Sequence, residues 1–131
     1  NPSRGLGDVY KRQGEIHAVM CFAYTNEIPE SVEELDIMSQ DAHLQSTLRG
    51  QNVGKIAIAY TVWSKKKGGG KLIVKEVFNK IKKSNHLNRL VTLSPLTDMA
   101  YKFHIKNGAK LISVNETTQN FEYKVIKNKK Y

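Results

Sequence analysis

The sequence has a single cysteine, three prolines and no long hydrophobic run. Cys21 cannot form an internal disulfide, and its place within the apolar run 18–24 indicates a buried thiol that packs as a small hydrophobic side chain. That run is far too short to span a bilayer. No stretch has the basic, apolar and small-residue order of a secretory signal. We therefore expect a cytoplasmic protein that does not act on a membrane.

Acidic residues are scarce after residue 54. Residues 1–54 contain four Lys/Arg and eight Asp/Glu, whereas residues 55–131 contain seventeen Lys/Arg and four Asp/Glu. A basic segment of this kind suits nucleic acid or a small ligand with several phosphates, although a solvated lysine-rich surface has the same composition. Histidines are also few, and His17, His43 and His86 lack the spacing of metal ligands, so we expect no metal site.

The length of 131 residues is that of one domain. Residues 1–13 show neither helical nor strand periodicity. They are typical of translated vector or adaptor sequence, although a natural disordered arm has the same character. We therefore expect these residues to lie outside the fold and predict a single domain over residues 14–131.

Several apolar segments rich in β-compatible residues predict a sheet. Residues 15–25 predict a buried strand, and residues 55–63, which are apolar on both faces, predict a central strand of a covered sheet. Residues 31–37 alternate polar and apolar side chains, which predicts a strand with one exposed face. Residues 41–52 fit either a short helix or a loop. Further strands are predicted at 89–93, 109–114 and 121–126, the last two as a hairpin across a loop at 115–120.

Two segments repeat apolar residues at helical spacing. The first runs from Leu72 to about Ser84 and carries lysines on its opposite face. The second begins at Thr97 and Asp98, which are N-cap residue types, and ends at Asn107-Gly108. Strands that alternate with helices in this order predict an α/β or α+β sheet covered by helices.

A glycine run stands between the central strand and the first of these helices. The segment Gly68-Gly69-Gly70 allows a bulky anion to approach the backbone, and the first N–H groups of a helix lack internal acceptors. Together with the helix dipole, this arrangement predicts a phosphate site, although a surface turn can have the same sequence. The lysines expected around it are Lys65, Lys66, Lys67 and Lys71.

Two other phosphate motifs do not match this segment. A nucleoside-triphosphate P-loop requires glycine where Lys65 stands and Ser or Thr where Leu72 stands. A dinucleotide-binding motif requires glycine at the position of Ile73. Neither class of nucleotide site is therefore expected.

Residues 65–70 and 97–109 match two motifs of one family. The pattern Gln/Arg-x-x-Gly-x-Gly/Ala corresponds to residues 65–70, with Lys65 in place of its first residue. The pattern Asn-x-x-Ala-x-x-Leu-Tyr-x-x-x-Gly-Phe corresponds to residues 97–109, where Ala100 and Gly108 are kept. On these residues, the passage 55–109 resembles the GNAT superfamily of acyl-CoA-dependent N-acetyltransferases.

The resemblance implies a mixed, mostly antiparallel sheet flanked by helices, of the acyl-CoA N-acyltransferase type. It implies acetyl-CoA as the acyl donor, with the pyrophosphate held at residues 65–71 and the pantetheine between two splayed strands. Tyr60, Thr61 and Val62 would then offer backbone groups to the pantetheine. The family's first strand and first two helices have no room upstream of Gly14, which implies an N-terminal truncation or a reduced member.

Three residues are candidates for the chemistry of the site, and the resemblance implies two of them. Thr97 replaces an asparagine that contacts the cofactor, and His104 replaces a tyrosine that protonates the departing thiolate. An unperturbed histidine titrates near neutral pH and can donate such a proton, although His104 also fits a structural place at the edge of the helix. Ser94 could form a hydrogen bond with a substrate, a water molecule or His104. Alternatively, a serine before a proline at the end of a strand is typical of an ordinary turn. The run 93–95 also resembles malonyl-CoA decarboxylase, which uses Ser and His, over three residues.

These observations favour an N-acetyltransferase that moves an acetyl group from acetyl-CoA to a small-molecule or peptide amine. One alternative is a nucleic-acid-binding module that uses the basic part of the chain, although its aromatic residues are not interleaved with its lysines. Another is a catalytically inactive domain that binds CoA or a protein partner. Edge strands of the sheet would allow a homodimer.

Overall fold

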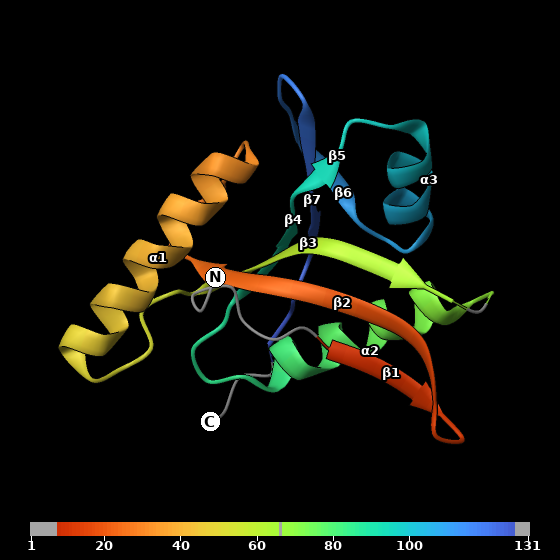
Figure 1. Ribbon diagram of the computed structural model, residues 1–131, viewed down its shortest axis with the longest axis horizontal. Coiled ribbons are helices and arrows are strands. Elements are labelled where there is room, and N and C mark those ends of the chain that lie inside the picture. Colours follow the sequence, from red (N-terminus) through yellow and green to blue (C-terminus); the bar gives the residue numbers. More distant parts are fainter. Residues whose placement is uncertain (1–7, 66, 128–131) are drawn as a thin grey trace.

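The computed structural model of the chain describes residues 8–65 and 67–127, which form one sheet and three helices (Figure 1). The helices are α1 Val32–Arg49, α2 Gly69–Lys83 and α3 Asp98–Lys106. The strands are β1 Asp8–Arg12, β2 Glu15–Thr25, β3 Ile56–Ser64, β4 Arg89–Thr92, β5 Ser94–Pro95, β6 Lys110–Val114 and β7 Thr118–Tyr123.

The sheet is mixed and mostly antiparallel. Its strands lie in the order β1-β2-β3-β4-β7-β5, and β6 pairs with β7. Among the described strands, only β3 and β4 run parallel, and α2 makes the crossover that parallel neighbours require. The predicted fold class, a mixed and mostly antiparallel sheet flanked by helices, is confirmed.

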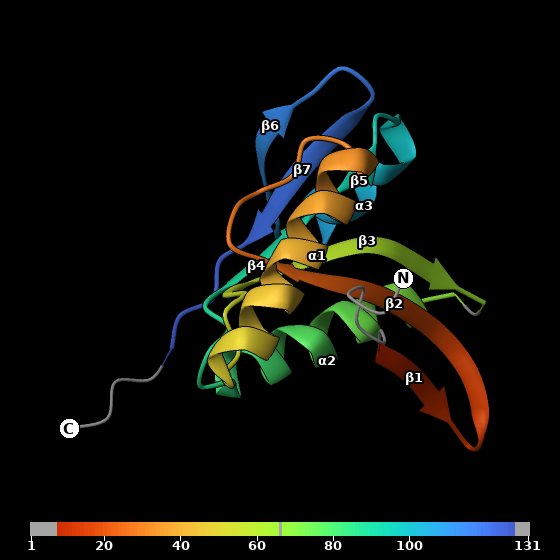
Figure 2. The same cartoon turned by 60° about the vertical axis from the view of Figure 1, so that its left-hand side comes forward.

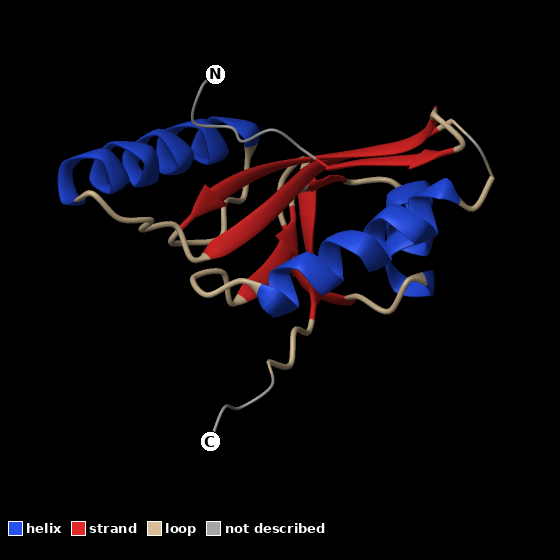
Figure 3. Cartoon of the chain, turned by 90° about the horizontal axis from the view of Figure 1, so that it is seen from below, coloured by secondary structure: helices blue, strands red, loops and turns tan. Residues whose placement is uncertain are grey.

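The central strand β3 buries side chains on both faces of the sheet, as its apolar sequence predicted. Successive side chains of a strand point to opposite faces. Ala57 packs in the cluster that contains Ile73 of α2, whereas Ile58 packs in the cluster that contains Leu35 of α1. Figure 3 shows these two helices on opposite sides of the strands. The sheet is therefore covered by α2 on one face and by α1 on the other.

The strand expected at residues 31–37 is wrong, because these residues begin the 18-residue helix α1. The hydroxyl of Ser31 accepts a hydrogen bond from the backbone N–H of Glu34 at 3.1 Å, which caps the helix. The Ser31-x-x-Glu34 spacing is a capping-box pattern that outweighs the short polar–apolar alternation. The helix continues into the ambiguous segment 41–52 and ends at Arg49, followed by the C-cap Gly50 with a left-handed φ of 66°.

The expectation that residues 1–13 lie outside the fold is wrong for residues 8–12. These residues form β1, which pairs antiparallel with β2 through partners such as Val9 and Val19. Residues 1–7 lie outside the described residues. Backbone pairing with the long edge of β2 forms this strand although its own sequence has no clear alternation.

The final strand begins three residues earlier than expected, because residues 118–120 belong to β7 rather than to a loop. These polar residues are buried, and their side chains are hydrogen-bonded to backbone groups of segments that are distant in the sequence. The side-chain amide of Asn120 donates to the carbonyl oxygens of Pro29 and Thr92, both at 2.9 Å. Hydrogen bonds to distant backbone make this burial possible, and a hydrophobicity pattern does not reveal them. Figure 2 shows the resulting β6–β7 hairpin beside α3.

Removal of the Ser31 hydroxyl tests the corrected start of α1. We expect Ser31→Ala to lower the free energy of unfolding by about 1 kcal/mol, because a cap is lost from the first turn. Urea denaturation of both proteins measures the difference. Asn85→Ala, at an exposed position between α2 and β4, is the control and should leave stability unchanged. Equal stability of Ser31→Ala and the unsubstituted protein would contradict the cap.

Candidate active site

The parallel strands β3 and β4 separate halfway along β3. Residues 56–59 of β3 pair with residues 89–92 of β4, and the backbone N–H of Leu93 then donates to the carbonyl oxygen of Ala59 at 2.9 Å. Beyond this bond the two strands take different partners. β3 continues beside β2, whereas Ser94 and Pro95 pair with β7. The strands therefore splay apart after Ala59, as the resemblance implied.

An irregularity in β3 reverses the side to which its backbone groups point. The register between β2 and β3 shifts so that Cys21 pairs with Thr61 and Phe22 with Ala59, which leaves Tyr60 as the extra residue. The carbonyl of Ala59 points to β4, but the N–H of Lys65, six residues later, donates to β2. In a regular strand, residues an even number apart share a side. After the bulge, the N–H and C=O of Val62 accordingly point to the open gap.

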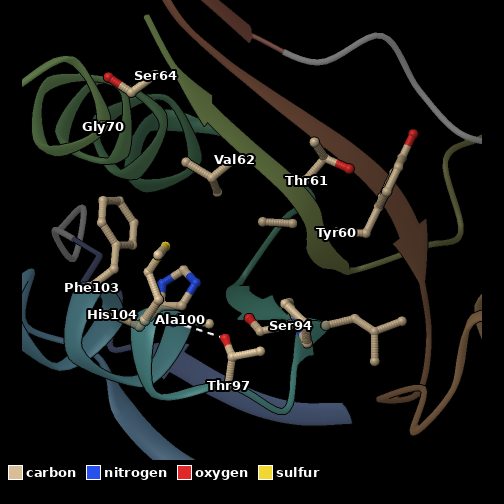
Figure 4. A pocket seen from close by; sticks show the side chains of 14 residues that line it. Tyr60, Thr61, Val62, Ser64, Gly70, Ser94, Thr97, Ala100, Phe103 and His104 are labelled. Carbon is tan, nitrogen blue, oxygen red and sulfur yellow. Dashed lines mark hydrogen bonds between the residues drawn. The ribbon is translucent and has the colours of Figure 1, made fainter. Parts of the chain in front are cut away.

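A cavity of about 300 Å³ fills the gap between the separated strands and α3. Figure 4 shows Val62 on the β3 side, with Phe103 and His104 on the α3 side and Ser94 near His104. The lining is mainly apolar, and its polar side chains are hydroxyls and one imidazole. The residues that line it are Ala59, Tyr60, Thr61, Val62, Ser64, Gly70, Leu93, Ser94, Pro95, Thr97, Met99, Ala100, Phe103 and His104.

The glycine run opens α2 at the rim of this cavity. Gly68 is the N-cap with a left-handed φ of 84°, a backbone conformation that favours glycine. A Cβ on Gly69 would come 2.8 Å from the carbonyl oxygen of His17, and one on Gly70 would come 2.7 Å from the ring of Phe103. Close packing thus explains two of the three glycines, a reason that the sequence did not reveal. Gly70 lines the cavity itself.

The start of α2 has no cap of its own among the described residues. Ser31 caps α1 and Thr97 caps α3 by accepting backbone N–H bonds, and acidic residues occupy the first turn of both helices. At α2, Gly68 provides no side-chain bond and the first turn has no acidic residue. Its N–H groups and the positive end of the helix dipole are therefore available to an external anion at the rim of the cavity.

The predicted lysines do not converge on one point. Lys65 is exposed and forms an ion pair with Glu15 at 3.7 Å, while Lys67 is exposed on the turn. Lys66 lies outside the described residues. Lys71 does not reach the cavity but lines a neighbouring groove of about 510 Å³ between α2 and the end of α3. That groove contains three further lysines, Lys75, Lys106 and Lys124.

His104 is buried against aromatic side chains and bonded to a tyrosine. Its Nδ1 lies 2.7 Å from the hydroxyl of Tyr123, and its ring centroid lies 4.9 Å from that of Phe121 and 5.0 Å from that of Phe103. Burial lowers the pKa of His104 to about 4. The premise of a histidine that titrates near neutral pH is therefore wrong, and His104 is a neutral imidazole at pH 7.

Ser94 and Thr97 reach the cavity, with their hydroxyls already engaged. The hydroxyls of Ser94 and Thr92 lie 2.8 Å apart, and Thr92 also accepts the backbone N–H of Phe121 at 3.1 Å. The bonded partner of Ser94 is thus Thr92 rather than His104. Thr97 accepts the N–H of Ala100 at 3.2 Å as the N-cap of α3. A hydroxyl can both donate and accept hydrogen bonds, so both side chains can still form a hydrogen bond with a ligand.

Most of the predicted site residues line the cavity. Tyr60, Thr61, Val62, Ser94, Thr97 and His104 all do so, as does Gly70. Sequence reasoning missed Ser64, Met99 and Phe103 as lining residues, and it missed Tyr123 as the partner of His104. Met99 and Phe103 share a helical stripe with Ala100, and this spacing could have indicated that both line the cavity. No local pattern connects Tyr123 to His104, because 19 residues separate them in the sequence.

Two further features of the described part of the chain bear on function. Within residues 8–65 and 67–127, no three His, Cys, Asp or Glu side chains come together as metal ligands. None of the described helices is long and apolar enough to cross a bilayer.

Comparison with solved structures identifies the fold. The chain is similar to the GphF GNAT-like decarboxylase in complex with isobutyryl-CoA, with a TM-score of 0.66 and 10% identity over 88% of this chain and 76% of that one. The loading GNATL domain of CurA from Lyngbya majuscula gives a TM-score of 0.65 and 10% identity over 88% and 74%. A variant of an agmatine N-acetyltransferase, in its apo form, gives a TM-score of 0.57 and 12% identity over 88% of this chain and 74% of that one.

No family model and no curated protein sequence matches the chain. The solved structures, despite low identity, establish that this chain has the GNAT fold. The resemblance that residues 65–70 and 97–109 suggested is therefore confirmed at the level of the fold.

The burial of His104 predicts a loss of stability in mild acid. Its pKa in the folded protein is about 4 against 6.5 as the ordinary value, so the unfolded chain binds more protons between these values. Stability should fall as pH falls from 7 to 5, by about 2 kcal/mol from this residue. Urea denaturation at both pH values measures the fall, which should be smaller in His104→Gln.

His43→Gln, at an exposed position on α1, is the matched control for this experiment. Its stability should depend on pH as strongly as that of the unsubstituted protein. An equal fall in stability for His104→Gln and His43→Gln would show that His104 is not the buried titrating group.

Proposed function

We propose that this protein is an acyltransferase that binds acetyl-CoA and transfers its acetyl group to an amine, either a small molecule or a peptide. One observation carries the proposal. The uncapped start of α2 borders the cavity that opens where β3 and β4 separate. A diphosphate at the helix start and a linear thioester arm in the cavity would lie next to each other, which is the order of groups in acyl-CoA.

The diphosphate of the donor would accept hydrogen bonds from the first N–H groups of α2. Phosphates are stabilised there by the unpaired amides and by the helix dipole. Lys67 on the turn and Lys71 in the first turn of α2 add positive charge to this end of the helix, and the neighbouring groove contains three further lysines. The GphF structure, which has the same fold, holds isobutyryl-CoA, which supports a CoA thioester as the ligand class.

The pantetheine and acyl group would occupy the cavity. The exposed edge of β3 after the bulge presents the N–H and C=O of Val62, groups that complement an amide of the pantetheine arm. The apolar lining suits a short acyl chain, and Thr97 at the start of α3 adds a hydroxyl to the cavity wall (Figure 4). A thioester bound here would lie near His104 and Ser94.

The transfer itself requires a nucleophile and an exchange of one proton. The nitrogen of the amine attacks the thioester carbonyl carbon, the C–S bond breaks, the nitrogen loses a proton and the thiolate gains one. His104 is neutral at pH 7, so no imidazolium supplies this proton. None of the 14 lining residues is Asp or Glu, so the acceptor would enter as a free amine rather than be deprotonated by a carboxylate of the cavity. Hydrogen bonds from His104 and Ser94 would stabilise the developing negative charge.

Charge reversal at the two ends of α2 tests the cofactor site. We expect the double variant Lys67→Glu and Lys71→Glu to weaken acetyl-CoA binding at least tenfold, because repulsion replaces attraction at the diphosphate; tenfold is about 1.4 kcal/mol. The double variant Lys82→Glu and Lys83→Glu at the opposite end of α2 is the matched control and should bind almost normally. Titration calorimetry measures both dissociation constants.

The same titration separates the proposal from the alternatives. Absence of acetyl-CoA binding by the unsubstituted protein at millimolar concentration would contradict the proposal. A nucleic-acid-binding module would instead bind DNA or RNA with an affinity that falls steeply with salt, and both double variants would weaken it. Binding of acetyl-CoA without release of free CoA thiol in the presence of any amine would indicate an inactive domain.

A further inference from the structure

The pair His104–Tyr123 lies between the cavity, which His104 lines, and the lysine-containing groove beside α2, which Tyr123 lines. Tyr123 lies on β7 with an exposed fraction of 4%, and its hydroxyl is 2.7 Å from His104 Nδ1. A buried O–H group costs stability unless it donates a hydrogen bond. The acceptor that the described residues offer this hydroxyl is Nδ1, so the phenol donates and the imidazole accepts.

A neutral imidazole that accepts at Nδ1 must carry its proton on Nε2. His104 lines the cavity whereas Tyr123 does not, so the ring turns Nδ1 toward Tyr123 and away from the cavity, which leaves the Nε2 edge for the cavity. The rings of Phe103 and Phe121 hold this orientation, since they pack on His104 with interplanar angles of 82° and 31°. Rotation of the imidazole would break the bond to Tyr123 and this packing together.

We propose that Tyr123 is a positioning residue that holds His104 in its Nε2-protonated neutral form, so that His104 presents a fixed hydrogen-bond donor to the ligand in the cavity. The proposal rests on the proposed function for the identity of that ligand, a CoA thioester. It assigns a role to a residue of β7 that neither motif of the sequence contains.

The pair supplies a hydrogen bond and keeps both of its protons. Transfer of the Nε2 proton to the thiolate would require either an imidazolate or a relay that leaves a phenolate at Tyr123. Burial raises the pKa of Tyr123, which disfavours the phenolate. The thiolate therefore takes up the proton that the attacking amine releases, directly or through water, while Nε2–H stabilises the negative charge during C–S cleavage.

Nitrogen NMR of the histidine ring tests this assignment without any turnover. In protein labelled with 15N at histidine, the His104 signals are identified by their absence in His104→Gln. We expect Nδ1 to give the signal of an unprotonated ring nitrogen and Nε2 that of a protonated one at pH 7. Addition of acetyl-CoA should shift the Nε2–H signal. A protonated Nδ1 in the unsubstituted protein would overturn the proposal.

Tyr123→Phe removes the hydroxyl and retains the ring. We expect this variant to show a mixture of the two tautomers and to lose the Nε2–H response to acetyl-CoA, with kcat reduced about 10- to 100-fold where an acceptor is turned over. Tyr101→Phe, at a tyrosine of α3 that is 42% exposed, is the matched control and should retain the Nε2–H form. A pure Nε2–H tautomer in Tyr123→Phe would also overturn the proposal.

The two proposals fail in different ways. If acetyl-CoA does not bind while His104 carries its proton on Nε2, the proposed ligand is wrong and the role of Tyr123 in fixing the tautomer stands. If acetyl-CoA binds while His104 carries its proton on Nδ1, the ligand is right and the role of Tyr123 is wrong. Should Tyr123→Phe fail to fold, the tautomer of the unsubstituted protein alone decides the matter.

Discussion

The separation of β3 from β4 is the constraint that creates the candidate site. Four residues of each strand are paired in parallel, and the bond from Leu93 to Ala59 marks the point where they part. If the parallel pairing of β3 with β4 continued, its hydrogen bonds would occupy the backbone N–H and C=O groups at the edge of β3. The two strands would then leave no cavity between them. Both halves of the site follow from this point, because α2 begins where β3 ends and α3 begins where β5 ends.

Two local features keep the strands apart. The bulge at Tyr60 turns β3 after Ala59, and the pairing of Ser94 with Gln119 draws the other strand toward β7. The side chain of Gln119 strengthens that turn by donating to the carbonyl oxygens of Pro95 and Thr97 at 3.0 and 3.1 Å. A buried polar residue of β7 thus holds the wall of the cavity. This arrangement gives the polar residues 118–120 a structural reason to be buried in a strand.

Much of the fold was predictable because its central elements have strong local signals. The apolar segments 15–25 and 56–64 and the lysine-flanked stripe of α2 occur close to their expected places. The misassigned elements depend on other information. The start of α1 depends on a capping pattern at Ser31, β1 depends on pairing with β2, and Asn120 is buried through bonds to backbone from distant segments.

The candidate site was predictable to the extent that it is local in sequence. Gly70 of the glycine run, residues 60–62 of β3 and the residues at the start of α3 come from three short segments, and all of them line one cavity. The electrostatic state of His104 was not predictable, because burial and the partner Tyr123 come from the tertiary structure. The same holds for Gly69 and Gly70, whose missing side chains make room for His17 and Phe103.

In the proposed function, acyl-CoA lies from the start of α2 into the gap between β3 and β4. Backbone amide NMR during a titration with CoA examines this placement residue by residue. We expect the largest shifts at Val62, Gly69 and Gly70, with little change along α1 or at the far end of α2. Shifts confined to the lysines at the end of α2, or none at millimolar CoA, would rule this placement out.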